Sequence, residues 1–319
     1  MLVQKGVLYL SMIFMLFFWA FYSSRVYYSY LKNPTKRCSG FKYYLYAGMG
    51  VIFETFFFAI LIWSKFPSIW SLICGPIAIF VGIKFLENRH LQRQSTKKNL
   101  CGREVWVVNN KNVANAYADF RTNKIFVTEA LVELLEEDEL CAIIEHEVGH
   151  LKNTKLAYIS SYAQVIYLIS VFTIIGFVIV LILTKPSLEI LGLYLSLYAI
   201  IYLSTVIATL WNWLNEHEAD LNSNRKECLS RALLKLEMYN TLKRIYEVNA
   251  KSLKLTLTKF TELKPKEIKY NDVVKALLSL ILIDPLELFR ESILGHMPPS
   301  HPPTLFRLFA LQNYSKRNA

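Results

Sequence analysis

Long apolar segments interrupt this chain at intervals and give the first prediction about its fold. Three of them, at about 7–24, 43–63 and 68–86, come before the first long polar stretch, and two more follow it at about 156–184 and 188–212. A membrane-spanning helix needs roughly 17 to 25 apolar residues. The pattern therefore predicts a mainly α, polytopic membrane protein with about five transmembrane helices.

The first two apolar segments carry further information. The first has a long aromatic core with no A-x-A cleavage site after it, so we expect a retained helix rather than a signal peptide. The second contains Glu54, an ionisable residue that is costly in lipid and can mark a functional site. We interpret Glu54 as a protonated or hydrogen-bonded contact between helices.

Basic residues in the loops indicate which side of the membrane each loop faces. The loop 31–42 has four basic residues and no acidic one, whereas the loop 64–67 has only Lys65. Because cytoplasmic loops are enriched in Lys and Arg, we expect the first of these loops in the cytoplasm. Alternation across the five spans then places 87–155 and 213–319 there as well, with the N-terminus outside.

The polar segments predict a small mixed domain. Between about 104 and 128, short runs of alternating apolar and polar residues favour three strands, which we expect to form a meander. The spacing then becomes helical from Thr128, with a longer helix from about Asp138 to Asn153. We expect another helix over 213–250, continuing out of the fifth span, and we interpret the short apolar run at 277–283 as core.

Composition fits this picture and excludes one class of function. The chain is 54% apolar and only 19% charged, with a net charge of +11. No nucleic-acid-reading motif accompanies that charge, so we expect no nucleic-acid partner. The five cysteines are scattered without a CxxC pair, which predicts free thiols in a reducing compartment rather than a disulfide framework.

The central chemical motif is HExxH at residues 146–150 on a predicted helix. Histidines at i and i+4 lie on one helix face, so His146 and His150 can bind the same zinc ion. Glu147 is rotated by about 100° from His146, beside the open coordination position, where it can accept a proton from a water molecule. This spacing predicts a metal-dependent hydrolase.

A catalytic zinc ion needs a third protein ligand, and the segment WNWLNEHEAD at 211–220 offers two candidates. Glu216 and Asp220 lie at i and i+4 and so share a helix face. His217 is the competitor, because neutral imidazole is the commoner ligand type. The residue pattern alone leaves Glu216 and His217 nearly even.

Four motifs resemble those of the integral-membrane gluzincins, a family that includes the HtpX heat-shock proteases and the CAAX prenyl proteases. The matches cover about 105–307 and are, in chain order, Asn115-Ala116-Tyr117 of the family's edge strand, HExxH, ExxAD at Glu216, Ala219 and Asp220, and HPPTxxR from His301 to Arg307. The resemblance implies one catalytic zinc ion with Glu216 as its third ligand.

The resemblance also implies roles for residues around the ligands. Asn115 and Ala116 would bind an extended peptide along a strand edge, although they equally suit an ordinary strand beside a turn. Asp220 would support the ligands from behind them, with Arg307 as its partner. His301 would stabilise the oxyanion of the tetrahedral intermediate, or it would only cap the final helix.

These observations predict a membrane-embedded zinc endopeptidase with polypeptide substrates, mainly membrane proteins, in a multi-pass cell membrane. We expect its domains to be an N-terminal membrane region 1–98, two cytoplasmic protease halves at 99–155 and 213–319, and a transmembrane hairpin 156–212 between them. The HtpX proteases are similar to one another in a four-span plan, and the CAAX proteases in a seven-span plan. Five spans are too few for the enclosed chamber of the CAAX proteases, so we expect a role in quality control like that of the HtpX proteases. The alternatives are a CAAX-type or peptide-processing protease, or a non-catalytic zinc-stabilised scaffold or chaperone.

Overall fold

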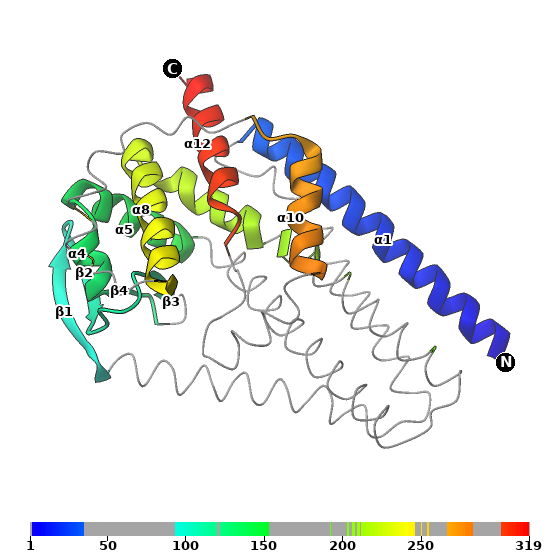
Figure 1. Ribbon diagram of the computed structural model, residues 1–319, viewed down its shortest axis with the longest axis horizontal. Coiled ribbons are helices and arrows are strands. Elements are labelled where there is room, and N and C mark those ends of the chain that lie inside the picture. The colour runs from blue at the N-terminus through cyan, green and yellow to red at the C-terminus, as the bar shows by residue number, and fades with distance from the viewer. Residues whose placement is uncertain are drawn as a thin grey trace.

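The computed structural model describes several stretches of the chain and a few isolated positions between them. The stretches are 2–34, 93–119, 122–152, 212–245, 267–282 and 301–318. The described part is mainly helical and contains one four-stranded sheet (Figure 1). The predicted spans at 43–63, 68–86 and 156–184, together with Glu54, lie outside the described residues.

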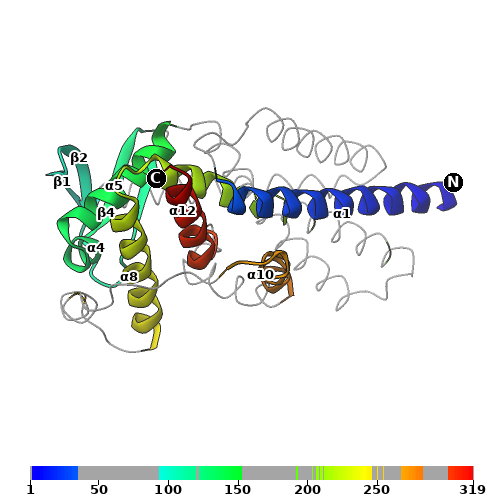
Figure 2. The same cartoon turned by 90° about the horizontal axis from the view of Figure 1, so that it is seen from above.

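The first predicted span falls within α1 (Leu2–Lys32). Figures 1 and 2 show α1 running away from the sheet, with the N-terminus at its remote end. Aromatic side chains near its middle are exposed, among them Phe14, Phe17 and Phe18. Within the described residues, no helix meets the length and apolarity required to cross a membrane.

The sheet consists of β1 (Ser95–Leu100), β2 (Arg103–Val108), β4 (Lys124–Thr128) and β3 (Ala116–Asp119), in that spatial order. Pairing of β2 with β4 is parallel, whereas β1–β2 and β3–β4 are antiparallel. The expected meander is therefore wrong.

Burial explains the order of the strands. The core of β4, Ile125 to Val127, is fully buried, so this strand takes an inner position. β3 is only half-buried apart from Asp119 and lies at an edge of the described sheet. The sequence pattern did not reveal β1, because its lysines give a polar edge strand with no apolar alternation.

Helices follow the sheet directly. The Oγ1 atom of Thr128 accepts a hydrogen bond from the Leu131 amide, which begins α4 (Glu129–Leu134). The next helix, α5 (Glu137–Lys152), begins within a residue of the expected start and continues to the last described residue of this stretch. At its start the Oε2 atom of Glu139 accepts the Glu136 amide at 3.0 Å, and α5 packs against β3 and β4.

The expected continuous helix over 213–250 is interrupted. The helical segment 212–222 ends before Ser223, and α8 begins afresh (Lys226–Ile245). Side chains supply the hydrogen bonds at the break: Ser223 Oγ accepts the Arg225 amide at 3.2 Å, and Glu145 Oε2 accepts the Asn224 amide at 2.8 Å. Such local bonds compete with helix continuation.

The remaining helices close the described fold. α8 packs along α5, where Lys235 Nζ lies 2.8 Å from Glu139 Oε2 in a buried ion pair. α12 (Thr304–Asn318) contacts both α8 and the end of α1. α10 (Tyr270–Leu282) also lies against α1, and it buries Leu277 but leaves Leu278 exposed, so the run at 277–283 is core only in part.

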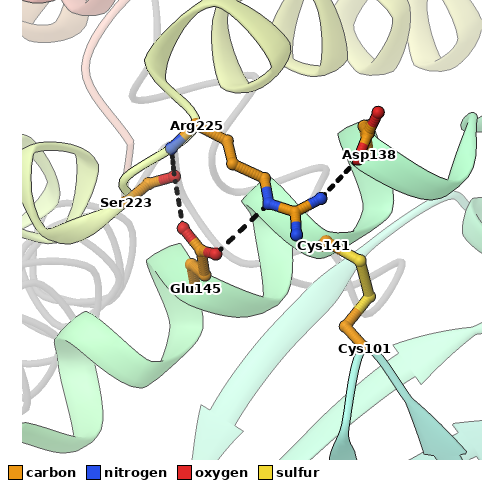
Figure 3. The surroundings of a disulfide bond; sticks show 6 residues. All are labelled: Cys101, Asp138, Cys141, Glu145, Ser223 and Arg225. Carbon is orange, nitrogen blue, oxygen red and sulfur yellow. Dashed lines mark hydrogen bonds and ion pairs between the residues drawn. A yellow bond between two sulfur atoms is a disulfide. The ribbon is translucent and has the colours of Figure 1, made fainter.

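A disulfide bond joins the sheet to α5. Cys101, in the turn between β1 and β2, bonds to Cys141 with a Cα–Cα distance of 5.5 Å (Figure 3). Cys101 has φ 54° and the following Gly102 has φ 72°, a left-handed turn that favours glycine. The expectation of free thiols is therefore wrong for these two cysteines, whereas Cys228 is a free thiol.

Candidate active site

The two histidines of HExxH lie one turn apart on α5. Their rings meet edge to face with centroids 4.8 Å apart, and their Nε2 atoms are separated by 3.2 Å. His146 is buried and His150 is partly buried. The helical spacing alone therefore brings two imidazole nitrogens to one point.

Glu216 reaches the same point from the helical segment 212–222. Its Oε2 atom lies 3.5 Å from His146 Nε2, and its Oε1 atom lies 3.3 Å from His150 Nε2. Among the described residues, these three side chains form the group able to hold a metal ion, with one ligand atom from each lying within 4.8 Å of the others.

His217 points elsewhere, although it is the neighbour of Glu216. Its Nε2 atom lies 2.8 Å from the hydroxyl of Tyr27 on α1, and its ring is buried. Burial lowers the pKa of His217 from 6.5 to about 4, so this imidazole is neutral at physiological pH. The structure thus brings Glu216, and not His217, to the two histidines.

Asp220 lies behind His146. Its Oδ1 atom is 2.9 Å from His146 Nδ1, which fits an Nδ1–H donor and leaves Nε2 available to a metal ion. Burial alone would lower the pKa of His146, but its hydrogen bonds to Asp220 and Glu216 raise the pKa from 6.5 to about 9. The aspartate therefore fixes both the tautomer and the orientation of this imidazole.

Arg307 pairs with Asp220 in a buried two-point contact. Arg307 Nε donates to Oδ2 at 2.8 Å and Nη2 donates to Oδ1 at 2.5 Å. Burial by itself would raise the pKa of Asp220, but Arg307 outweighs burial and holds the pKa far below its usual range. The carboxylate is thus charged, and α12 is tied to the segment 212–222.

His301 contacts the carboxylate of the third candidate ligand, Glu216. Its Nδ1 atom lies 2.6 Å from Glu216 Oε2, while about half of the side chain, 53%, remains exposed. Burial would raise the pKa of Glu216, but the nearby His301 and His150 hold it well below its usual range. The observed contact therefore orients the Glu216 carboxylate, and His301 precedes the first residue of α12 by three positions.

The other predicted site residues lie on α5 and at the start of β3. Glu147 is buried on α5, one residue beyond His146. Ala116 begins the edge strand β3 and Asn115 directly precedes it, where the Thr128 amide donates to the Asn115 carbonyl at 2.9 Å. Because β3 packs beside α5, this edge of the sheet is adjacent to the HExxH helix.

Sequence reasoning missed one residue at this site. Tyr27 contacts the ligand-bearing segment from a helix far away in the chain. Nothing in the local sequence around Tyr27 distinguishes it from the other aromatic residues of α1, so no sequence signal could have found it.

Comparison with family models identifies the chain. The model for peptidase family M48 matches residues 88–315, which is well over half of the sequence. The chain belongs to peptidase family M48. The family indicates a zinc metallopeptidase, and its matched region contains the histidines, Glu216, Asp220, His301 and Arg307 described above. Comparisons with curated proteins and with solved structures give no match.

The donor set of this M48 peptidase fits a catalytic zinc ion. Two imidazole nitrogens and one carboxylate oxygen are three protein ligands, which leaves a fourth position for water or substrate. Two of the three ligands also have a supporting contact of the kind that orients ligands in zinc sites: Asp220 holds His146, and His301 holds Glu216.

Proposed function

We propose that this M48 peptidase is a membrane-associated zinc endopeptidase with a role in the quality control of membrane proteins. One observation carries the catalytic part: His146, His150 and Glu216 converge from two helices, and Glu147 lies beside them on α5. In this proposal the first three residues bind the metal ion and Glu147 is the general base.

Each residue has a defined task in the reaction. A bound zinc ion would lower the pKa of a water molecule to about 7 and polarise the scissile carbonyl. Glu147 accepts the proton of the attacking water and passes it to the departing amine. Asp220 and His301 hold the ligands in orientation, so the base and the ligands keep a constant separation during turnover.

Substrate binding in this proposal uses the edge strand β3. A strand that is paired on one side only can add an extended peptide on the other through backbone hydrogen bonds. Asn115 and Ala116 stand at its start, and β3 lies against the helix that carries Glu147. The edge therefore supports a role in aligning the peptide with the catalytic group.

Two features support a membrane setting for the substrates. The sequence places the apolar stretch 156–184 directly after the HExxH helix, and a second one at 188–212 directly before Glu216. Exposed aromatic residues on α1 add apolar surface of the kind that contacts lipid or other proteins. We infer that the two protease halves, 99–155 and 213–319, meet at a bilayer and act on polypeptides that emerge from it.

We place the catalytic side in the cytoplasm. The C-terminal end of α1, which the basic segment 31–42 follows in the sequence, packs against α12 of the catalytic domain, and basic loops favour the cytoplasmic side. Disulfide bonds are rare in the cytoplasm, so the Cys101–Cys141 bond is the observation that opposes this placement.

A comparison of cells that produce the wild type with cells that produce Glu147→Gln tests the proposed function. Membrane fractions of wild-type cells should contain fragments of membrane proteins that are missing when the base is removed. If the two fragment patterns agree while the purified wild-type enzyme still cleaves soluble peptides, the membrane-protein substrates are wrong but the peptidase assignment stands.

A further inference from the structure

The hydroxyl of Tyr27 and the imidazole of His217 form a buried hydrogen bond between segments that are distant in sequence. The two atoms, Oη and Nε2, are 2.8 Å apart, and the side chains are 0% and 1% exposed. Tyr27 belongs to α1, which precedes the region matched by the family model. A residue outside the recognised peptidase region thus reaches the ligand-bearing segment.

The position of His217 links this hydrogen bond to the candidate metal ligands. His217 directly follows Glu216, and its Nδ1 atom lies 4.0 Å from Asp220 Oδ2. That nitrogen has no hydrogen-bond partner among the described residues. A neutral imidazole has one N–H group, and the nearby carboxylate favours the tautomer with the proton on Nδ1. Nε2 is then the acceptor, and Tyr27 donates to it.

Two hydrogen bonds and one longer approach of 4.0 Å lead from α1 to the ligand His146. Tyr27 donates to His217, whose Nδ1–H faces Asp220, and Asp220 in turn accepts from His146 Nδ1. Because the hydrogen bond from Tyr27 fixes the His217 ring next to Glu216 and beside Asp220, a change at Tyr27 should alter the setting of the segment 212–222.

Packing around Tyr27 supports the same conclusion. Its ring lies 5.4 Å from the Trp213 ring and 6.4 Å from the Phe306 ring, between the ligand-bearing segment and α12. A few residues on, Asn313 Nδ2 donates to the Leu31 carbonyl at 3.0 Å, which fastens the end of α1 to α12. α1 thereby contacts both elements that carry Asp220 and its partner Arg307.

We propose that Tyr27 is a positioning residue of the peptidase and that it acts through His217 to hold Glu216 and Asp220 in their metal-binding orientation. The helix α1 is then a part of the catalytic unit as well as an N-terminal segment. The proposal rests on the metallopeptidase assignment and is independent of the nature of the substrates.

The test is Tyr27→Phe in the full-length protein, which removes one oxygen atom. Substitution of a group that orients a metal ligand costs about 10- to 100-fold in metal affinity, and Tyr27 is two contacts beyond such a group, so we expect about 3- to 10-fold weaker zinc binding. The visible absorption of the cobalt-substituted variant should change, and kcat should fall with KM unchanged. Thermal unfolding of the metal-free variant measures stability separately.

A matched control is Tyr28→Phe, the same chemical change one residue along α1. The Tyr28 ring packs against Tyr270 with centroids 5.7 Å apart, so this variant should keep the cobalt spectrum, zinc affinity and kcat of the wild type. A Tyr27→Phe protein that is folded and has wild-type zinc affinity, cobalt spectrum and kcat would overturn the proposal.

A second variant tests the proposal if the Tyr27→Phe protein does not fold. In Tyr27→Phe/His217→Leu both polar partners are removed, so no buried group is left without its hydrogen bond. If the hydrogen bond positions the ligands, this double variant folds but keeps the weaker zinc binding and the altered cobalt spectrum. Full recovery of zinc affinity and kcat would show that Tyr27 only satisfies a buried histidine, and the proposal would be wrong.

Discussion

Gly149 and Ala219 mark the crossing point of the two segments that carry the candidate metal ligands. A Cβ atom built on Gly149 would lie 2.9 Å from the Cα atom of Ala219 and 3.2 Å from its Cβ atom. The backbones are therefore in contact at this point, and only the absence of a side chain permits it. Both residues belong to the motifs themselves, HExxH and ExxAD, so the small residues set the distance between the ligands.

Gly149→Ala should push these segments apart. Extra atoms in a well-packed contact typically cost about 1 to 3 kcal/mol, and here the displaced backbone carries Glu216. We expect lower thermal stability together with weaker zinc binding, measured by competition with a chelator. Gly192→Ala is the control, because its Cβ would meet no atom within 4 Å, so it should be neutral or slightly stabilising. Equal effects of the two substitutions would contradict the crossing-point argument.

Glu147→Gln should abolish peptide cleavage and leave the metal site intact. The amide keeps nearly the same shape but cannot accept the proton of the attacking water, so kcat should fall by at least about 100-fold. Bound zinc, measured by elemental analysis, should stay at the wild-type level. Persistent proteolysis by this variant would sink the assignment of the base and would favour a non-catalytic role for the buried glutamate.

Replacement of the third ligand distinguishes two neighbouring residues. Glu216→Gln removes the carboxylate that lies 3.3 Å from His150 Nε2, so zinc should bind far more weakly. His217→Gln changes a side chain that faces Tyr27, so its effect on zinc affinity should be much smaller. Calorimetric titration of both metal-free proteins compares them directly, and the opposite order would make His217 the ligand.

Zinc binding should depend on pH through His146. Before a metal ion binds, carboxylates raise its pKa from 6.5 to about 9. Protonation of His146 stabilises the metal-free protein fully below the unfolded-state pKa of 6.5. This contribution to stability is lost as the pH rises through the folded-state pKa of about 9. Zinc must displace that proton, so its affinity should increase with pH up to about 9.

Asp220→Asn provides the comparison for this pH dependence. Loss of the carboxylate lowers the pKa of His146, so the rise in zinc affinity should move to lower pH in the variant. Chelator competition measures the zinc affinity of both proteins between about pH 6 and 9.5, a range that includes both pKa values of His146. A wild-type affinity that is constant above pH 7 would show that His146 is already neutral there.

The Cys101–Cys141 bond should stabilise the oxidised protein. It closes a loop with a sequence separation of 40 residues, for which loop entropy predicts a contribution on the order of 4 kcal/mol. Cys141→Ser and wild type in dithiothreitol should both unfold at lower temperature than the oxidised wild type. Cys228→Ser is the control, because that thiol takes no part in the bond.

The state of the same cysteines in cells tests the proposed side of the membrane. In the cytoplasm both thiols should be free and should react with a maleimide reagent after rapid acid trapping. A pair that is already oxidised in cells would place the catalytic domain in an oxidising compartment and would contradict the orientation drawn from loop charges.

Local spacing determined the centre of the candidate site. His146 and His150 share a helix face because one turn separates them, and that relation holds in any α-helix of this sequence. The start of α5 was predicted to within a residue from the same helical spacing. Spacing could not decide between Glu216 and His217 as the third ligand, because both lie on the same helix turn. The family resemblance decided in favour of Glu216.

Contacts between remote segments were decided only by the tertiary structure. The strand order β1-β2-β4-β3, the break at Ser223, the Cys101–Cys141 bond and the Tyr27–His217 bond all join residues far apart in the chain or depend on such partners. Periodicity reports which face of an element is buried, but not what it is buried against. The sequence therefore determined the chemistry that this peptidase contains, and the packing of α1, α5 and α12 around Glu216 decided how that chemistry is held in place.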